Sequence, residues 1–125
     1  MGCRGTIEIW NNGAAPKNEE KPVVLYTHWG ANNMIFDLIK VLKRKLRWKS
    51  PSYLSRMIFC EMVKGNESDE YGYGIMTENV CDAEKEIVVD CDRQEVIIKG
   101  TDVYINMTYT FSQLIKERNF KDKRK

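Results

Sequence analysis

Two consecutive amphipathic helices, with short strand-like runs before and after them, constrain the fold of this chain most. Apolar residues recur at helical spacing between residues 35 and 46, and again between residues 54 and 62. Ser50-Pro51 is typical of a helix start and Gly65 of a helix end, so the two stripes belong to separate helices. The predicted stripes are Ile35, Leu38, Ile39, Leu42 and Leu46, followed by Leu54, Met57, Ile58 and Met62. Because each helix has one apolar stripe, each needs a second element to cover it.

The runs around the helices predict the sheet that covers them. Residues 6–10 alternate apolar and polar side chains, and residues 23–29 form a second run after a polar loop, which predicts an antiparallel hairpin. Residues 73–77, 87–92 and 96–99 predict further strands, as do residues 103–109, which pair either within the chain or with a partner subunit. A helix is predicted over residues 111–118. The expected fold is α+β: an antiparallel β-sheet with two consecutive helices packed on one face and a C-terminal helix.

Length and composition fit one domain of the cell interior. The chain has 125 residues, 42% hydrophobic and 30% charged, and we expect a single domain over residues 1–120 and a basic tail over residues 121–125. No apolar run approaches the ~20 residues of a membrane span. The 4 cysteines form no C-x-x-C pair and His28 is the single histidine. The sequence therefore predicts no metal site, no cofactor and reduced thiols in a cytoplasm.

Charge is unevenly distributed along the chain. Basic residues run without an acid from Lys40 to Lys49, whereas residues 61–95 are mostly acidic. The pattern predicts one positive and one negative face, with three interpretations open. Both faces are simply solvated, or copies of the chain associate through opposite charges, or the basic side takes an anionic ligand. Nucleic acid along the basic helix is the competing partner, although no helix-turn-helix, zinc-finger or RNA-binding signature accompanies the run.

The segment from Tyr26 to Gly30 is the first candidate site. It leads from the second strand into the first helix, where unpaired backbone amides attract a phosphate. Trp29 or Tyr26 would stack a base there, and His28 would donate a hydrogen bond. The alternative is that Trp29 fills the core, Gly30 makes the turn, and His28 is a satisfied or exposed side chain. Residues 71–74, Tyr-Gly-Tyr-Gly, are a second candidate, because tyrosines offer flat contact area and glycines a close backbone approach; strand entry explains them equally well.

Two isolated arginines are the candidate anion ligands. Arg56 lies in an otherwise apolar helix, and Arg118 lies near the C-terminus outside the basic run. Each guanidinium can hold two oxygens, so the pair would suit a diphosphate if the fold brings them together. Asp90 and Asp92 point to one side of a strand, which suits a divalent metal or, as the preferred interpretation, a solvated strand face. With no G-x-S-x-G turn, the sequence predicts no catalytic residues and a binding protein rather than an enzyme.

Several motifs together resemble a group of small phage and prophage proteins. They are Met1-Gly2-x-Arg4-Gly5-x-Ile7, Tyr26-x-His28-Trp29-Gly30, Arg47-Trp48, Tyr53-Leu54-x-Arg56-Met57-Ile58-Phe59, Gly72-Tyr73-Gly74-Ile75 and Val88-Val89-Asp90. The resemblance spans about residues 1–98. Members of this group tend to carry an acidic residue after the tryptophan, where this chain has Gly30-Ala31, so the resemblance does not define a role for that turn.

In outline the chain is also similar to the Thoeris anti-defence proteins, which as dimers or larger assemblies sequester cyclic ADP-ribose-type signals made by host TIR enzymes. This resemblance implies a phage-encoded homo-oligomer in the host cytoplasm that traps a small anionic nucleotide-like ligand without cleaving it. Arginines would grip the phosphates while aromatic rings stack the adenine. The residues expected at this ligand site are Arg56, Arg118, Trp29, His28, Tyr73 and Phe111. The alternative function is a nucleic-acid- or protein-binding accessory factor acting through the basic helix 40–49.

Overall fold

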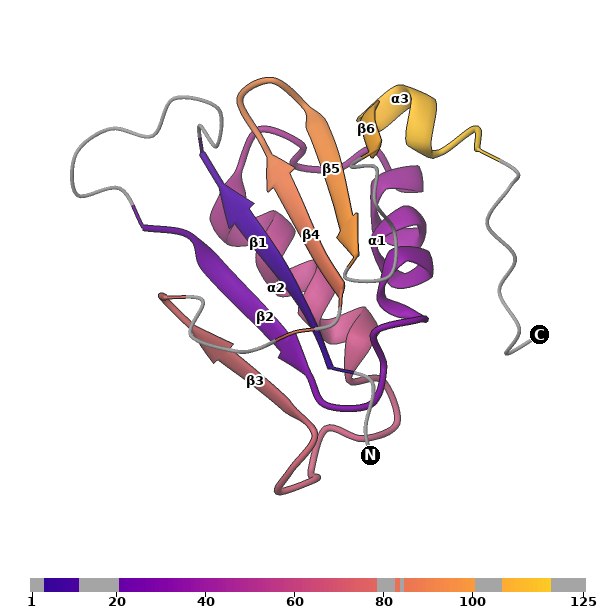
Figure 1. Ribbon diagram of the computed structural model, residues 1–125. Coiled ribbons are helices and arrows are strands. Elements are labelled where there is room, and N and C mark those ends of the chain that lie inside the picture. Colours follow the sequence, from indigo (N-terminus) through magenta and orange to yellow (C-terminus); the bar gives the residue numbers. More distant parts are fainter. Residues whose placement is uncertain (1–3, 12–20, 79–82, 84, 101–106, 118–125) are drawn as a thin grey trace.

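The chain forms one six-stranded sheet with helices against it, as a computed structural model describes for residues 4–11, 21–78, 83, 85–100 and 107–117 (Figure 1). Within these residues the strand order across the sheet is β3 (Tyr73–Met76), β2 (Val23–Thr27), β1 (Gly5–Trp10), β4 (Lys85–Asp90), β5 (Glu95–Gly100) and β6 (Met107–Thr110). The element order along the chain begins with two strands and continues through two consecutive helices to the remaining strands and a short last helix. The predicted α+β class is therefore confirmed.

The predicted N-terminal hairpin is the centre of the sheet. β1 (Gly5–Trp10) and β2 (Val23–Thr27) pair antiparallel, with Gly5 opposite Thr27 and Ile9 opposite Val23. The alternation of β1 turns Ile7 and Ile9 into the hydrophobic core. β3 (Tyr73–Met76) extends the sheet antiparallel on the outer side of β2.

One central pairing differs from the sequence prediction, which had only antiparallel strands. β4 (Lys85–Asp90) runs parallel to β1, in register from Gly5–Lys85 to Trp10–Asp90. β5 (Glu95–Gly100) and β6 (Met107–Thr110) then add antiparallel pairs, so the sheet is mixed. The chain passes through both long helices and β3 before β4 returns to the free side of β1. Such a long connection sets the direction of β4, and no local pattern reports it.

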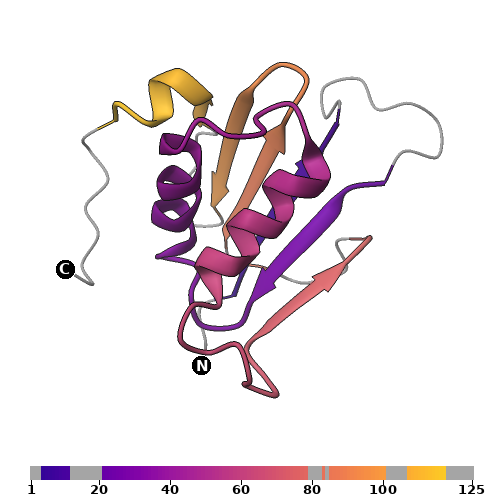
Figure 2. The ribbon, with the colours of Figure 1, turned by 180° about the vertical axis from the view of Figure 1, so that it is seen from behind.

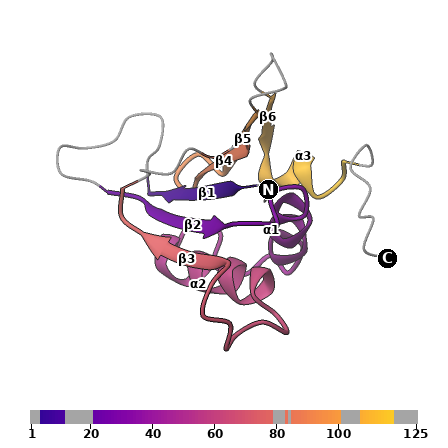
Figure 3. The ribbon, with the colours of Figure 1, turned by 60° about the horizontal axis from the view of Figure 1, so that its bottom comes forward.

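Two helices cover one face of the sheet, as predicted. α1 (Met34–Lys43) and α2 (Pro51–Met62) lie together on that side, which Figure 2 shows from the helix side and Figure 3 along the layers. Pro51 occupies the first turn of α2, where its missing N–H costs no hydrogen bond. The helices and the sheet share one core, which includes Leu25, Leu38, Leu42, Leu54, Ile58, Ile87, Val89 and Val96.

The connection between the helices begins earlier than predicted. α1 ends at Lys43, so Leu46 does not belong to the buried stripe and is 54% exposed. Lys45 and Arg47, on either side of it, have φ angles of 57° and 58°. This left-handed conformation costs a residue with a side chain about 1–2 kcal/mol. The prediction that the apolar stripe continues to Leu46 is wrong, because the left-handed turn that ends the helix contains no glycine to indicate it in the sequence.

A short C-terminal helix closes the far edge of the sheet. α3 (Phe111–Leu114) ends before the predicted boundary, and Arg118 lies outside the described residues. Thr110 caps α3: its hydroxyl accepts a hydrogen bond from the Gln113 N–H at 3.0 Å, while the Gln113 side chain accepts one from the Thr110 N–H at 2.9 Å. Of the strand predicted over residues 103–109, the described part begins at Met107.

Candidate functional site

The end of β2 and the start of β3 together form an aromatic surface, consisting of Tyr26, His28, Trp29 and Tyr71. Trp29 is 60% exposed and Tyr71 is 73% exposed. The alternative that Trp29 fills the core is therefore wrong. A large apolar ring left in solvent at the end of a strand is a stronger indication of a binding surface than an isolated exposed leucine, because aromatic rings dominate binding energies.

Trp29 is held in place by a glycine of the neighbouring segment. A Cβ atom added to Gly72 would lie 2.6 Å from Cζ3 and 3.1 Å from Cε3 of the indole, so the ring rests directly on the Gly72 backbone. Gly72 also has a φ of 103°, a conformation that side chains disfavour. Both the close approach and the backbone angle require glycine at this position. The indole is consequently in direct contact with the backbone of the segment before β3.

His28 is fixed between two of the other rings. Its ring centroid lies 4.8 Å from that of Trp29 in an edge-to-face arrangement. Its Nδ1 atom is 2.9 Å from the Tyr26 hydroxyl, and its backbone N–H donates to the Gly72 carbonyl at 2.8 Å. Tyr26 and His28 are two residues apart in an extended segment, so their side chains point to the same side. The aromatic surface is thus ordered before any ligand arrives.

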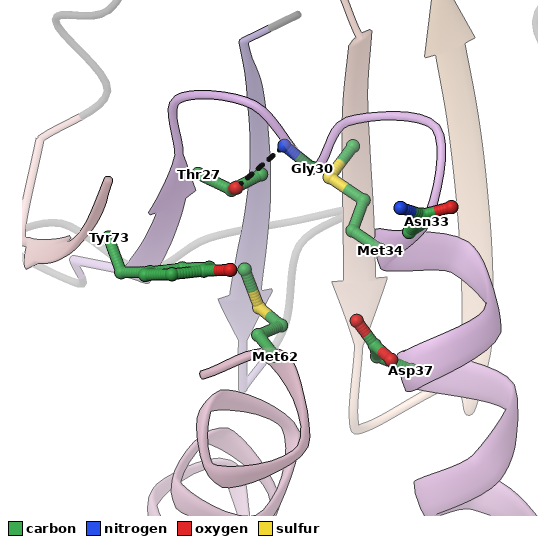
Figure 4. Close-up of a pocket in the computed structure, with 7 residues that line it drawn as sticks. All are labelled: Thr27, Gly30, Asn33, Met34, Asp37, Met62 and Tyr73. Carbon is green, nitrogen blue, oxygen red and sulfur yellow. Dashed lines mark hydrogen bonds between the residues drawn. The ribbon is translucent and has the colours of Figure 1, made fainter. Parts of the chain in front are cut away.

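A small pocket lies beside this surface, between the end of β2 and the two helices (Figure 4). Its lining residues are Thr27, Gly30, Asn33, Met34, Asp37, Met62 and Tyr73. The cavity volume is about 50 Å³. That is room for a few water molecules, whereas pockets for drug-sized ligands measure roughly 300–1,000 Å³. Tyr73 belongs to this pocket, and a nucleotide would have to lie on the open surface instead.

The start of α1 is poorly suited to the predicted phosphate. The Gly30 N–H donates to the Thr27 hydroxyl at 2.9 Å, and the Gly30 carbonyl accepts from the N–H groups of Asn33 and Met34. Asp37 stands in the first turn and is only 4% exposed. The Asp37 carboxylate already takes the stabilising interaction that the positive end of the helix dipole offers to a negative charge. An anion at the same place would be repelled.

The residues predicted for the ligand site do not all converge within one chain. Trp29 and His28 are in contact just after β2, whereas Tyr73 lines the small pocket beside them. Arg56 is exposed on α2, with Nη1 4.0 Å from the Cys60 sulfur. Phe111 is fully buried and meets the edge of Trp48 at 5.4 Å between ring centroids, which leaves it no surface for stacking adenine. Arg118 is outside the described residues, so its distance from Arg56 stays a prediction.

The structure brings the two candidate segments of the sequence into contact, which the sequence did not predict. The sequence predicts residues 26–30 and residues 71–74 as separate candidate sites, yet Trp29 rests on Gly72 and the His28 N–H donates to the Gly72 carbonyl. The sequence also offered no reason to include Arg4, which is exposed and precedes Gly5, the partner of Thr27. Contacts between segments far apart in the chain form the site, and no local sequence pattern predicts such contacts.

The basic run is divided between internal contacts and free surface. Arg44 pairs with the buried carboxylate of Glu61 at 2.7 Å, and Arg47 lies over the Tyr53 ring at 4.8 Å. The lysines of the run are exposed, and no described ion pair involves them: Lys40, Lys43, Lys45 and Lys49. The arginines therefore stabilise the helix connection, and the lysines present the positive charge.

Asp90 has a structural role that the sequence analysis did not anticipate. Its side chain is buried, and Oδ1 accepts from the N–H groups of Asp92 at 3.0 Å and Arg93 at 3.1 Å. The preferred interpretation of a solvated strand face is wrong for Asp90, because the strand ends there and the carboxylate closes the turn. Burial, and secondly the charge of Asp90, raise the pKa of the Cys91 thiol to about 12. Among the described residues, no three His, Cys, Asp or Glu side chains gather as metal ligands would.

Comparisons with protein-family models, curated proteins and solved structures found no match for this chain. None of the helices in the described part has the length and apolar character that a bilayer crossing requires. The described part of the chain is an α+β protein with exposed aromatic side chains at one end of its sheet.

Proposed function

We propose that this protein binds a small nucleotide-derived ligand and holds it without cleaving it, with the ligand's flat ring stacked on Trp29. The observation that carries the proposal is the exposed indole supported by Gly72. A ring that is already fixed loses little conformational freedom on binding, so stacking contributes more of its energy to affinity. Stacking of a base on an aromatic side chain contributes about 1–3 kcal/mol.

The ligand class comes from the resemblance to anti-defence proteins, and the chemistry of the surface is compatible with it. His28 offers a polar ring edge beside the indole, and exposed Arg4 stands at the neighbouring strand end. A guanidinium holds a phosphate by two hydrogen bonds. A cyclic ADP-ribose-type signal has the flat base and the phosphates that these groups would recognise.

The proposed ligand would require more than one copy of the chain for tight binding. The pocket beside Trp29 holds about 50 Å³, and the acidic Asp37 lines it. Ligands of nucleotide size usually bury most of their surface when they bind tightly. An assembly of copies would provide the second wall and the additional cations, in agreement with the homo-oligomer that the resemblance implies.

Isothermal titration with ADP-ribose and with cyclic ADP-ribose tests this function. Trp29→Ala should weaken binding of the recognised probe by about 5- to 150-fold, the equivalent of 1–3 kcal/mol of stacking. Trp29→Phe should retain most of the affinity, because a flat ring remains. Ile75→Ala removes a similarly exposed apolar side chain of β3, outside the aromatic surface, and should leave the affinity unchanged. Equal affinity of wild type and Trp29→Ala would remove Trp29 from the proposed site, and hydrolysis of the probe would indicate an enzyme.

A second candidate is a nucleic-acid-binding accessory factor that uses the basic run. It is supported by Lys40, Lys43, Lys45 and Lys49, which are exposed and belong to no described ion pair. Retention on DNA or RNA that falls steeply with salt, and that is lost when Lys43 and Lys49 are changed to glutamate, would favour this function. Arg44 and Arg47 are unsuitable for that test, because their internal contacts would be lost as well.

A further inference from the structure

The two charged segments of the chain lie at opposite ends of the molecule. The connection from α1 to α2 is at one end of the helical layer, and the connection from α2 to β3 is at the other, as both Figure 1 and Figure 2 show. The first connection contains the basic run and the second contains residues 66–70, which carry three acids. The fold therefore places the basic run and this acidic segment at opposite ends of the helical layer.

The basic end carries apolar side chains among its lysines. It consists of Lys43, Lys45, Leu46, Lys49 and Tyr53. Leu46 and Tyr53 are 54% and 53% exposed. The left-handed residues on either side of Leu46 are sterically costly, and they hold this leucine outside the core. Exposed apolar groups surrounded by charge are typical of a contact surface.

The acidic end has the same composition with the opposite sign. It consists of Glu67, Asp69, Glu70 and Tyr71, and Trp29 lies beside it on Gly72. Its carboxylates are exposed, and none of them takes part in a described ion pair. Tyr71 is the most exposed of the large apolar side chains in the described part of the chain. Each end thus presents what the other would bind: charge of opposite sign around apolar side chains.

We propose that copies of this chain associate head to tail, with the basic end of one copy against the acidic end of the next. The occupant of each end is a second copy, because one chain carries both complementary surfaces. The formal net charge of +2 leaves little overall repulsion between copies. A contact between two different surfaces is repeated by every copy, so it produces a ring or a filament rather than a closed pair.

This arrangement would also complete the proposed ligand site. The lysines of one copy would approach the surface of the next on which Trp29 lies, and would add their positive charge to that of exposed Arg4. That consequence rests on the proposed function. The association itself needs no ligand, so a failure to bind ADP-ribose probes would leave it intact.

Sedimentation velocity of the purified full-length chain at low and high salt is the first test. The wild type should form species larger than a dimer in about 50 mM salt and should dissociate in about 500 mM salt, where charges are screened beyond a few ångströms. Changing Lys43, Lys45 and Lys49 to glutamate should weaken association at least tenfold. Changing Glu67, Asp69 and Glu70 to lysine should weaken it to a similar extent.

Mixing these two variants separates head-to-tail contact from every other arrangement. One variant has two acidic ends and the other has two basic ends, so each alone should be monomeric. An equimolar mixture should associate again, because acidic and basic ends once more meet. Arg56→Glu alters a charge on the exposed side of α2 and should have no effect on the wild-type assembly.

Three results would overturn the proposal. A wild type that stays monomeric at about 100 μM in low salt has no such contact, because standard interfaces associate well below that concentration. Association that persists in both charge-reversed variants arises from another surface, such as the free edge of β3. Association that disappears after nuclease treatment is caused by nucleic acid bound to the lysines.

Discussion

Replacing Gly72 by alanine tests the structural basis of the aromatic surface. The new Cβ would lie 2.6 Å from the Trp29 ring, a distance that side chains do not tolerate, and the backbone would keep a φ of 103°. The backbone conformation alone costs about 1–2 kcal/mol for a residue with a side chain. Because Trp29 is 60% exposed, its ring can turn aside, and a side chain moved off its preferred rotamer costs about 0.5–1.5 kcal/mol. Gly72→Ala should therefore lower the free energy of unfolding by about 1.5–3.5 kcal/mol.

Gly65→Ala is the matched control, because it isolates the backbone cost. Gly65 has a φ of 87°, and an added Cβ would meet nothing within 4 Å. This variant should lose only the backbone share, about 1–2 kcal/mol. Both values are measured by urea unfolding followed by circular dichroism. The difference between the two losses of unfolding free energy is the cost of displacing the Trp29 ring from Gly72.

A double-mutant cycle assigns that difference to Trp29. In a Trp29→Ala background the clash is removed, so Gly72→Ala should cost no more than Gly65→Ala does. The tryptophan emission of Gly72→Ala should also change, since the indole loses its supporting surface. Equal costs for the two glycine variants, or an excess cost that survives in the Trp29→Ala background, would refute the contact on which the aromatic surface depends.

Two further predictions concern buried groups. The pKa of the Cys91 thiol is about 12 in the folded protein, compared with an ordinary value of 9.0. The unfolded chain therefore loses this proton at a lower pH than the folded protein does. The free energy of unfolding is unaffected below pH 9 and falls as the pH rises from 9 toward 12. In urea unfolding above pH 9, wild type should lose up to about 1.4 kcal/mol more per pH unit than Cys91→Ala, and parallel curves would contradict this. Arg44→Met leaves the buried Glu61 carboxylate without its closest partner and should cost about 1–3 kcal/mol, whereas exposed Lys43→Met should cost less than about 0.5 kcal/mol; equal effects would refute the pairing.

Local sequence patterns predicted most of the helices and strands, because the spacing of apolar residues within each element reflects which of its faces is buried. The alternation in β1 and the stripe of α1 are both consequences of facing one core, and both can be read within a few residues. The parallel pairing of β1 with β4 could not be read in this way. It depends on where the chain returns after two helices and a further strand, and no single segment encodes that path.

In the candidate site, too, local patterns identified single residues, whereas contacts between distant segments decide where their side chains lie. The sequence singled out Trp29, His28 and Tyr73, since such residues at a strand end are typical of binding segments. It could not decide whether Trp29 is buried, because the indole contacts Gly72, which lies in the segment before β3, far away in the sequence. Alternation placed Asp90 on a solvated face for a related reason, since the turn that its carboxylate closes begins just after the strand. The Phe111 assignment failed because a buried ring and a stacking ring look alike in sequence.

The most direct test of the central claim is mass spectrometry of small molecules released by heat from the protein purified out of cells that make cyclic ADP-ribose-type signals. We expect an intact nucleotide-derived molecule near one equivalent per site from wild type, and at least tenfold less from Trp29→Ala. Equal release from both proteins, a cleaved product, or no nucleotide-like molecule at all would contradict the account.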